Sequence, residues 1–191
     1  IKCILIYTVK QADVYTLNGL YQLKNMKIHD DFLPDDQFRY LTNYMYGPDF
    51  SWHYGIILDK ELECDELDNI QFGHIFYSNF QPQSPGFSVI EPIIRSPKLK
   101  VTSLFRVKAN LNVRTPEIVR HGFHVDLPYK STTAIYYVNT NDGYTEFEDG
   151  TKIESVENRL VTFDSSLKHT GTTCTDSKIR CVINFNYTSE L

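Results

Sequence analysis

Residues 178–187 read KIRCVINFNY, a run in which apolar and polar side chains alternate. One face carries Ile179, Cys181, Ile183, Phe185 and Tyr187, and the other carries Arg180, Val182, Asn184 and Asn186. Successive side chains of a strand point to opposite sides, so this run predicts a β-strand with its apolar face in a core. If the polar face lines the interior of a barrel, Arg180 offers a planar fork that fits a carboxylate. The alternative is that Arg180 faces water.

The chain is rich in β-forming residues from Val101 onward. Seven short runs rich in Val, Ile, Thr, Phe and Tyr occupy residues 101–113, 122–126, 132–139, 144–147, 151–155, 159–164 and 178–187. Turn signals fall between them at Asn141-Asp142-Gly143 and at Asp149-Gly150. Short strands at this spacing predict an antiparallel sandwich or barrel.

Residues 26–100 are expected to form a helical half that packs outside this sheet. Leu33-Pro34-Asp35-Asp36 has the proline and the early acids of a helix start, which predicts a helix over residues 35–46. Further helices are predicted around residues 65–76 and 89–94, with turn-rich residues 78–86 between them. The fold class is therefore mainly β with flanking helices.

Length and composition limit the function classes. The 191 residues suit one domain, expected over residues 26–191 because the domain character begins at Met26, with residues 1–25 as an N-terminal extension. The net charge of -5 argues against nucleic acid or an anionic membrane as a partner. No apolar run approaches the roughly 20 residues of a membrane span, so a soluble protein is expected.

The cysteines indicate the compartment. Four are present, namely Cys3, Cys64, Cys174 and Cys181. None forms a CxxC pair, so neither a zinc site nor a redox dithiol is indicated. Reduced thiols in an intracellular, cytoplasmic protein are the expectation.

The motif His124-Val125-Asp126, in the β-rich half, contains two candidate metal ligands. Its two metal-binding side chains lie two positions apart and so on one face of a strand. His169 comes 43 positions after Asp126 and follows the predicted strand 159–164, so a folded barrel can bring it beside them. Two histidines and one carboxylate leave three positions open on a metal, which is the arrangement of non-haem Fe(II) oxygenases.

These elements together resemble a known family. In order and spacing, His124-Val125-Asp126, the run TAIYYVN at 133–139, His169 and Arg180 resemble the catalytic core of the prolyl hydroxylase branch of 2-oxoglutarate/Fe(II) oxygenases. Ala109-Asn110-Leu111 resembles the strand before the metal motif, and residues 30–34 resemble the opening helix. The resemblance implies a double-stranded β-helix, or jelly-roll, over residues 101–187.

The resemblance also implies residue roles. His124, Asp126 and His169 would bind Fe(II), and Arg180 would pair with the distal carboxylate of the cosubstrate 2-oxoglutarate. Tyr137 matches a tyrosine that hydrogen-bonds this carboxylate, although a plain core aromatic is the alternative. Two asparagines, Asn184 and Asn110, would line the cosubstrate pocket. Dioxygen is the second cosubstrate and ascorbate an optional reductant, and the implied reaction hydroxylates an unactivated C–H bond with release of succinate and CO2.

Departures from the family pattern leave the substrate open. Leu111 stands where many prolyl hydroxylases carry a tyrosine, so its hydrogen bond is missing or comes from Asn110 or Asn112. Asp149-Gly150 replaces a frequent Gly-Gly pair, and the anchor is Arg where collagen-type enzymes have Lys. A protein or peptide side chain, prolyl included, is the leading substrate, followed by a free amino acid or small metabolite and then by a nucleobase. The oligomeric state stays undecided.

Two other function classes remain open. A jelly-roll binding module would keep the barrel without turnover, and a zinc hydrolase would use the same three ligands with a bound water. Arg180 separates them from an oxygenase, because a hydrolase needs no carboxylate anchor far from its metal. The remaining histidines, His121 included, are expected to be structural or at the rim. The aromatic residues of 50–54 and 71–86 either pack on the sheet or form a lid.

Overall fold

The computed structural model describes residues 26–57 and 70–189. The first elements are β1 (Lys27–His29), α2 (Asp35–Met45), β2 (His53–Ile56), β3 (Ile70–Ser78), β4 (Gln81–Pro82) and α3 (Phe87–Ile94). The β-rich half follows with β5 (Val101–Val113), β6 (Thr132–Tyr137), β7 (Asn141–Phe147), β8 (Lys152–Ser155), β9 (Arg159–Asp164), β10 (His169–Gly171) and β11 (Ile179–Ser189).

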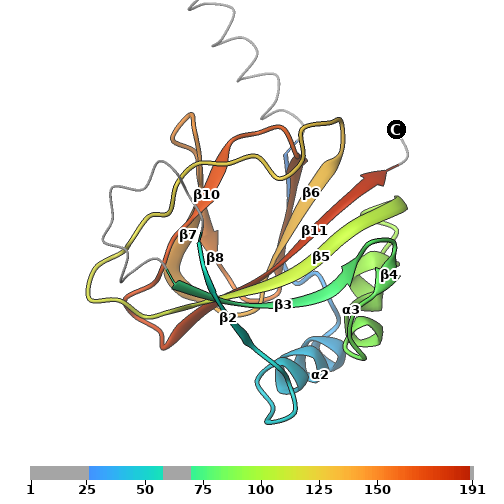
Figure 1. Ribbon diagram of the computed structural model, residues 1–191, viewed down its shortest axis with the longest axis horizontal. Coiled ribbons are helices and arrows are strands. Elements are labelled where there is room, and N and C mark those ends of the chain that lie inside the picture. The colour runs from blue at the N-terminus through green and yellow to red at the C-terminus, as the bar shows by residue number, and fades with distance from the viewer. Residues whose placement is uncertain (1–25, 58–69, 190–191) are drawn as a thin grey trace, which may run out of the picture.

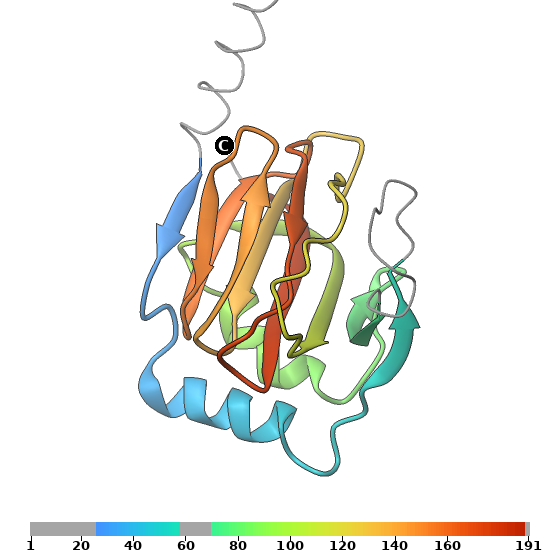
Figure 2. The same ribbon diagram turned by 90° about the vertical axis from the view of Figure 1, so that its left-hand side faces the viewer.

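The strands form two antiparallel sheets that face each other (Figure 1). The large sheet has the order β1-β9-β6-β11-β5-β3-β2, with β4 paired to β3, and the small sheet has the order β10-β7-β8. Figure 2 shows β1 at the edge of the large sheet beside β9. An antiparallel sandwich or barrel was predicted, and the two facing sheets confirm this class of fold.

Two cores flank the large sheet. The outer core joins α2 and α3 to the sheet, and Ile183, Phe185 and Tyr187 of β11 lie in it. The inner core lies between the sheets and contains Ile135, Tyr137, Phe147, Ile153, Val161, Phe163 and Val182. Alternate residues of β11 therefore face opposite cores, so the polar face predicted from residues 178–187 points into the space between the sheets.

The two helices that the structure describes begin close to their predicted positions. Pro34 caps α2, which has Asp35 and Asp36 in its first turn and buries Leu41 and Met45. Acids in a first turn favour the positive end of the helix dipole. The helix α3 buries Val89, Ile90 and Ile93 and covers the predicted helix 89–94. No helix within residues 26–57 and 70–189 is long and apolar enough to cross a membrane.

The predicted helix over residues 65–76 is wrong where the structure describes it. Residues 70–76 belong to β3, and residues 65–69 lie outside the described part, as does the predicted extension 1–25. Aromatic residues alternate along β3, so that His74 and Phe76 are buried while Ile75 is exposed. Pairing with β5 and β2 on its two sides outweighs the local helical pattern. The half of the domain expected to be helical thus also contributes four strands.

Two further local predictions need correction. Residues 122–126 form no regular strand, because the structure has only an isolated bridge between His124 and His169 there. The predicted turn Asn141-Asp142-Gly143 is the first part of β7, where the register shifts between Asn141 and Tyr144. A Cβ atom at Gly143 would stand 2.6 Å from Cδ of Arg180, so close approach rather than a turn requires this glycine. The turn at Asp149-Gly150 is present, with Gly150 at φ 87°.

Asn158 ties the start of α2 to the turn before β9. Its side-chain oxygen accepts hydrogen bonds from Leu33 N (2.9 Å) and from the Tyr136 hydroxyl (2.8 Å), and its Nδ2 donates to Leu33 O at 2.8 Å. Its backbone adopts φ 58°, a left-handed conformation that Asn tolerates better than most residues. One buried side chain therefore satisfies three polar groups at the junction of helix and sheet.

Replacing this side chain should destabilise the fold. Asn158→Ala strands three buried polar groups and is expected to lower the free energy of unfolding by about 2–4 kcal/mol, measured by urea denaturation. Asn79→Ala is the matched control, because Asn79 has a similar φ of 51° but is exposed. The control should cost about 1 kcal/mol. Equal losses in the two variants would contradict the role of the Asn158 hydrogen bonds.

Candidate metal centre

Within residues 26–57 and 70–189, one group of side chains has metal-binding geometry. His124, Asp126 and His169 each offer one ligand atom, and these atoms lie within 4.8 Å of one another. His124 and His169 face each other across an isolated antiparallel bridge, with both N–H to O bonds at 3.0 Å. Directly opposed residues project to the same face of a sheet, and the two imidazole centroids are 4.7 Å apart. The sequence prediction that these three residues meet agrees with this geometry.

The hydrogen bonds of the two imidazoles leave their Nε2 atoms available for a metal. His169 Nδ1 donates to Leu167 O at 2.9 Å, and His124 Nδ1 lies 3.3 Å from Gly122 O. A ring that donates from Nδ1 keeps its lone pair on Nε2. Burial lowers the pKa of His169, and this effect exceeds the opposing influence of Asp126. The neutral imidazole that results is the form that binds metal ions.

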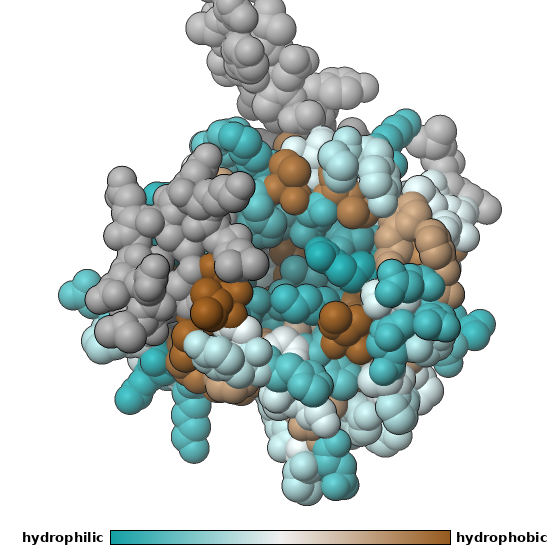
Figure 3. All heavy atoms as spheres, viewed as in Figure 1, coloured by the Kyte–Doolittle hydropathy of each residue, from teal (hydrophilic) through white to brown (hydrophobic). Residues whose placement is uncertain are grey.

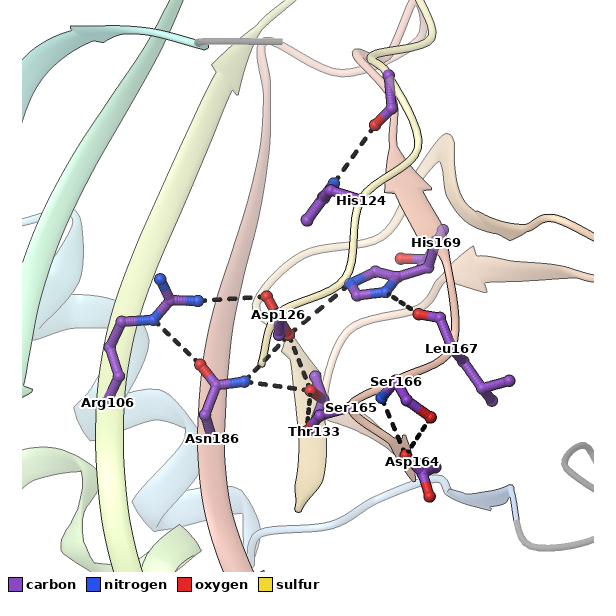
Figure 4. Close-up of polar contacts among 12 residues, drawn as sticks. Arg106, His124, Asp126, Thr133, Asp164, Ser165, Ser166, Leu167, His169 and Asn186 are labelled. Atoms are coloured by element: carbon purple, nitrogen blue, oxygen red, sulfur yellow. Dashed lines mark hydrogen bonds and ion pairs between the residues drawn. The ribbon is translucent and has the colours of Figure 1, made fainter. Parts of the chain in front are cut away.

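Asp126 is held from three strands of the large sheet (Figure 4). Its Oδ1 accepts from Arg106 Nη2 at 3.2 Å, and its Oδ2 accepts from Thr133 Oγ1 at 2.8 Å and Asn186 Nδ2 at 3.0 Å. Burial raises the pKa of Asp126, but the opposing effects of His169, the Thr133 hydrogen bond, Arg106 and the Asn186 hydrogen bond are together larger, so the pKa is lowered. The carboxylate is thus ionised and fixed in orientation.

A cavity of about 420 Å³ opens beside these three residues. The strands β5 and β11 supply one wall from their inward face: Arg106, Lys108, Asn110, Asn112, Arg180, Val182 and Asn184. The opposite wall contains Thr145 and Gly171 of the small sheet. Figure 3 shows hydrophilic side chains around the hollow between the sheets, with a few apolar ones among them. The cavity thus connects the metal-binding cluster with Arg180.

Arg180 is buried, with 3% of its surface exposed. Its Nε donates to Ser155 Oγ at 2.9 Å and its Nη2 to Thr145 Oγ1 at 3.2 Å. No carboxylate of the described residues lies within ion-pair distance, so its neighbours are hydroxyl groups and the Tyr137 ring, 5.8 Å from the guanidinium carbon. A buried charge without a counter-ion is costly, so this arrangement suits an anionic ligand.

The other predicted pocket residues surround this charge. Tyr137 is fully buried in the inner core, and its hydroxyl donates to Thr145 Oγ1 at 2.9 Å, the same atom that Arg180 contacts. Asn110 and Asn184 line the cavity, and their buried Oδ1 atoms have no hydrogen-bond partner among the described residues. Leu111 pairs with Cys181 and Phe72 and points to the other side of the sheet. The cavity therefore receives Asn110 and Asn112 in place of a side chain from position 111.

Sequence reasoning missed several cavity residues. Neither Arg106 nor Lys108 was singled out, although both lie on the same face of the predicted strand 101–113 as Asn110. His121 was expected to be structural or at the rim. It is buried, its Nε2 lies 3.1 Å from Asn112 Nδ2, and it also lines the cavity, which was not predicted. Its offset on a regular strand would point it away, but residues 121–124 do not form one.

The expected lid aromatics divide into two groups. Phe50 and Phe76 are buried in the outer core, and Trp52 packs against it. Tyr54 and Phe80 are exposed. Packing therefore accounts for the first group, and the lid hypothesis is limited to the second. Arg120 is largely exposed, and its Nη1 forms an ion pair with Glu146 Oε2 at 3.6 Å.

The comparisons with known proteins gave matches only among solved structures. No protein-family model matches the chain, and no curated protein does. The chain is similar to a prolyl hydroxylase from Trichoplax adhaerens in complex with a hypoxia inducible factor peptide (TM-score 0.57, 15% identity, 95% of this chain and 94% of that one). It is also similar to a 2OG-Fe(II) oxygenase family oxidoreductase from Burkholderia pseudomallei (TM-score 0.57, 9% identity, 98% and 93%).

A third similar structure is that of SnoN, a non-haem alpha-ketoglutarate dependent epimerase from nogalamycin biosynthesis (TM-score 0.64, 11% identity, 93% of this chain and 83% of that one). Identities this low establish the fold alone. The chain has the fold of 2-oxoglutarate/Fe(II) oxygenases, with a jelly-roll core, and this confirms the predicted fold class.

The role of the hydrogen bonds that orient Asp126 can be tested by measuring metal affinity. Thr133→Val keeps the side-chain shape but removes the hydroxyl that donates to Asp126, so the carboxylate gains rotational freedom. Loss of such a supporting contact is expected to weaken Mn(II) binding by roughly tenfold, measured by electron paramagnetic resonance. Thr132→Val is the control, since Thr132 is only half-buried and its Oγ1 contacts Ser189. If both variants bind Mn(II) like the parent, Thr133 does not orient Asp126.

Proposed function

We propose that this chain is an Fe(II) and 2-oxoglutarate dependent oxygenase. The observation that carries the proposal is the pairing of two features in one cavity: a cluster of two histidines and one carboxylate, and a buried guanidinium without a carboxylate partner in the described residues. Either feature alone would also suit a different kind of site. Their combination suits a cosubstrate that chelates a metal at one end and carries a carboxylate at the other.

His124, Asp126 and His169 would hold the metal. Two imidazole Nε2 atoms and one carboxylate oxygen bind a divalent first-row metal and leave neighbouring positions open, which distinguishes Fe(II) oxygenase sites from closed structural zinc sites. Leu167 fixes the orientation of His169 through its carbonyl. When bound, iron supplies the oxidative chemistry that couples 2-oxoglutarate decarboxylation to attack on a C–H bond. The chain supplies the ligands and their orientation.

Arg180 would bind the distal carboxylate of 2-oxoglutarate. The bonds to Ser155 and Thr145 hold its guanidinium plane in place before the ligand arrives. Thr145 Oγ1 already accepts hydrogen bonds from Tyr137 and Arg180, so its own proton is free to be donated to the carboxylate. Asn110 and Asn184 line the space between anchor and metal. Ile135 and Val182 add apolar surface to this part of the cavity, which limits its water content.

A protein or peptide side chain is the leading substrate class, and hydroxylation is the leading reaction. The similar Trichoplax enzyme was solved with a peptide fragment, and this supports a peptide substrate. SnoN has a comparable fold and is an epimerase, so a small molecule is the second candidate. Prolyl specificity has no separate support from the cavity.

The two alternatives fit the site less well. A zinc hydrolase would use the three ligands but gives no reason for a buried Arg180. A metal-free binding module gives no reason for the fixed orientations of His169 and Asp126, and a metal-bound one would bind Fe(II) without forming succinate. The deciding experiment measures succinate formed from 2-oxoglutarate by the protein with Fe(II) and ascorbate, with and without EDTA. Succinate that does not depend on Fe(II), or no succinate at all, would refute the proposal.

The ligand set can be tested with His124→Ala. His124 is exposed to the cavity and contributes little to either core, so the variant should keep the parent's melting temperature but lose Fe(II)-dependent succinate formation. His29→Ala, at a histidine of β1 outside the cavity lining, should retain it. Equal turnover in parent and His124→Ala would exclude His124 as a ligand.

The anchor can be tested with Arg180→Gln and Arg180→Lys. Charge-assisted hydrogen bonds contribute about 1.5–3 kcal/mol, so the glutamine variant should need about 10–100 times more 2-oxoglutarate. The lysine variant should recover part of this loss, because a point charge cannot replace a planar fork. Titrations of 2-oxoglutarate at saturating Fe(II) give the comparison. Without ligand, the glutamine variant should be at least as stable in urea as the parent, since it removes an uncompensated buried charge. Coincident 2-oxoglutarate titration curves would exclude Arg180 as the anchor.

A further inference from the structure

Two cations lie two residues apart on the inward face of β5. The guanidinium group of Arg106 already has partners, because its Nη2 donates to Asp126 and its Nε donates to Asn186 Oδ1 at 3.0 Å. Lys108 is half-buried, and within the two described ranges its ammonium group has no hydrogen-bond or ion-pair partner. Burial and, second, the charge of Arg106 lower the pKa of Lys108. A cation held this way next to another cation is stabilised by an anion.

Lys108 lies where two cavities meet. It lines the metal cavity and also a second cavity of about 720 Å³, and the two cavities share Ile56, Gln71 and Lys108. A Cβ atom at Gly73 would lie 3.0 Å from Cε of Lys108, so the lysine chain lies across β3 at a position without a side chain. Nζ of Lys108 lies 3.6 Å from the same Cβ position, so the ammonium group also lies over β3.

The net charge of the metal cavity also favours an anionic ligand. Among its described lining residues are three cationic side chains, Arg106, Lys108 and Arg180, and one carboxylate, Asp126. Bound Fe(II) and the dianion 2-oxoglutarate add opposite charges of equal size, so two positive charges remain. The protein as a whole has a net charge of -5, so this excess is local.

We propose that the primary substrate carries an anionic group, a carboxylate or one of similar size and charge, which pairs with Lys108 at the junction of the two cavities. This inference rests on the proposed oxygenase function and names the substrate class of the same site. The body of the substrate occupies the second cavity, beside Tyr54 and His53, and its reactive carbon reaches the metal past Ile56 and Gln71. Arg180 binds 2-oxoglutarate and takes no part in binding the primary substrate.

One intramolecular alternative comes from the sequence. Residues 58–69, which connect β2 to β3, contain six acidic residues and one lysine. An acid of this segment would be an alternative to an external anion. The experiment must therefore distinguish an external anion from this segment.

The test uses inorganic phosphate as the probe. The protein is loaded with Mn(II) and saturating 2-oxoglutarate without oxygen, and paramagnetic broadening of the phosphorus-31 signal reports phosphate bound near the metal. We expect saturable broadening in the parent and in Lys108→Arg, and about tenfold weaker phosphate binding in Lys108→Gln, as for loss of one charge-assisted contact. Gly73→Ala should also weaken binding, because it displaces the lysine chain. Lys152→Gln is the control, since that lysine contacts the Tyr144 ring on the small sheet.

Several results would overturn the inference. Absence of saturable broadening would mean that phosphate does not bind near the metal. Equal broadening in the parent and in Lys108→Gln would mean that phosphate binds there without Lys108, for example directly to the metal. Broadening that appears only after the six acids of residues 58–69 are replaced by amides would assign Lys108 to that segment. A fall in 2-oxoglutarate affinity in Lys108→Gln as large as that in Arg180→Gln would make Lys108 a cosubstrate anchor. Failure of the parent to bind Mn(II) or 2-oxoglutarate would instead refute the proposed function itself.

Competition with phosphate identifies the source of the anion. N-acetyl-L-proline and its amide represent a small carboxylic acid, and a short peptide with a central Glu, compared with the same peptide containing Gln, represents a protein. Displacement of phosphate by the acid of a pair, at about tenfold lower concentration than by its amide, is the expected result. The pair with the larger difference identifies the source. Equal displacement by acid and amide in both pairs would contradict an anionic substrate group.

Discussion

The antiparallel register between β5 and β11 is the constraint on which the candidate site depends. It places Arg180 opposite Asn112, Asn184 opposite Lys108, and Asn186 opposite Arg106. Because side chains alternate along a strand, a slip of one residue would turn all these polar groups into the outer core and expose Ile183 and Phe185 to the cavity. The apolar residues packed against α2 and α3 therefore fix the position of the polar ones.

The site departs from what stability alone would favour. Arg180 is buried beside hydroxyl groups, and Gly143 leaves the space that its side chain occupies. Asp126, in contrast, has three donors from three strands. An ionised carboxylate held this firmly keeps its orientation whether or not a cation is present, whereas the guanidinium is prepared for a partner that the described chain does not supply. This difference between the two charges is the physical reason for assigning them different ligands.

Local sequence patterns failed where tertiary contacts decide the conformation. Residues 70–76 have a pattern that also suits a helix, but β2 and β5 offer backbone partners on both sides, and the segment becomes β3. Residues 141–143 have a turn composition, yet Gly143 serves close packing against Arg180 within β7. In each case the deciding contact comes from a residue far away in the chain, which a local window does not contain.

The sequence alone determined the alternation of β11, the start of α2, and the residue types of the cluster, because each depends on spacing within a few residues. The tertiary structure decided which groups meet. His124 and His169 are 45 positions apart, and only the backbone bridge sets their rings face to face. The support of Asp126 by Arg106, Thr133 and Asn186, the burial of His121, and the position of Lys108 between two cavities were likewise invisible in the sequence. Periodicity fixes the side of a strand on which a residue lies, whereas its partner across the barrel depends on strand order and register.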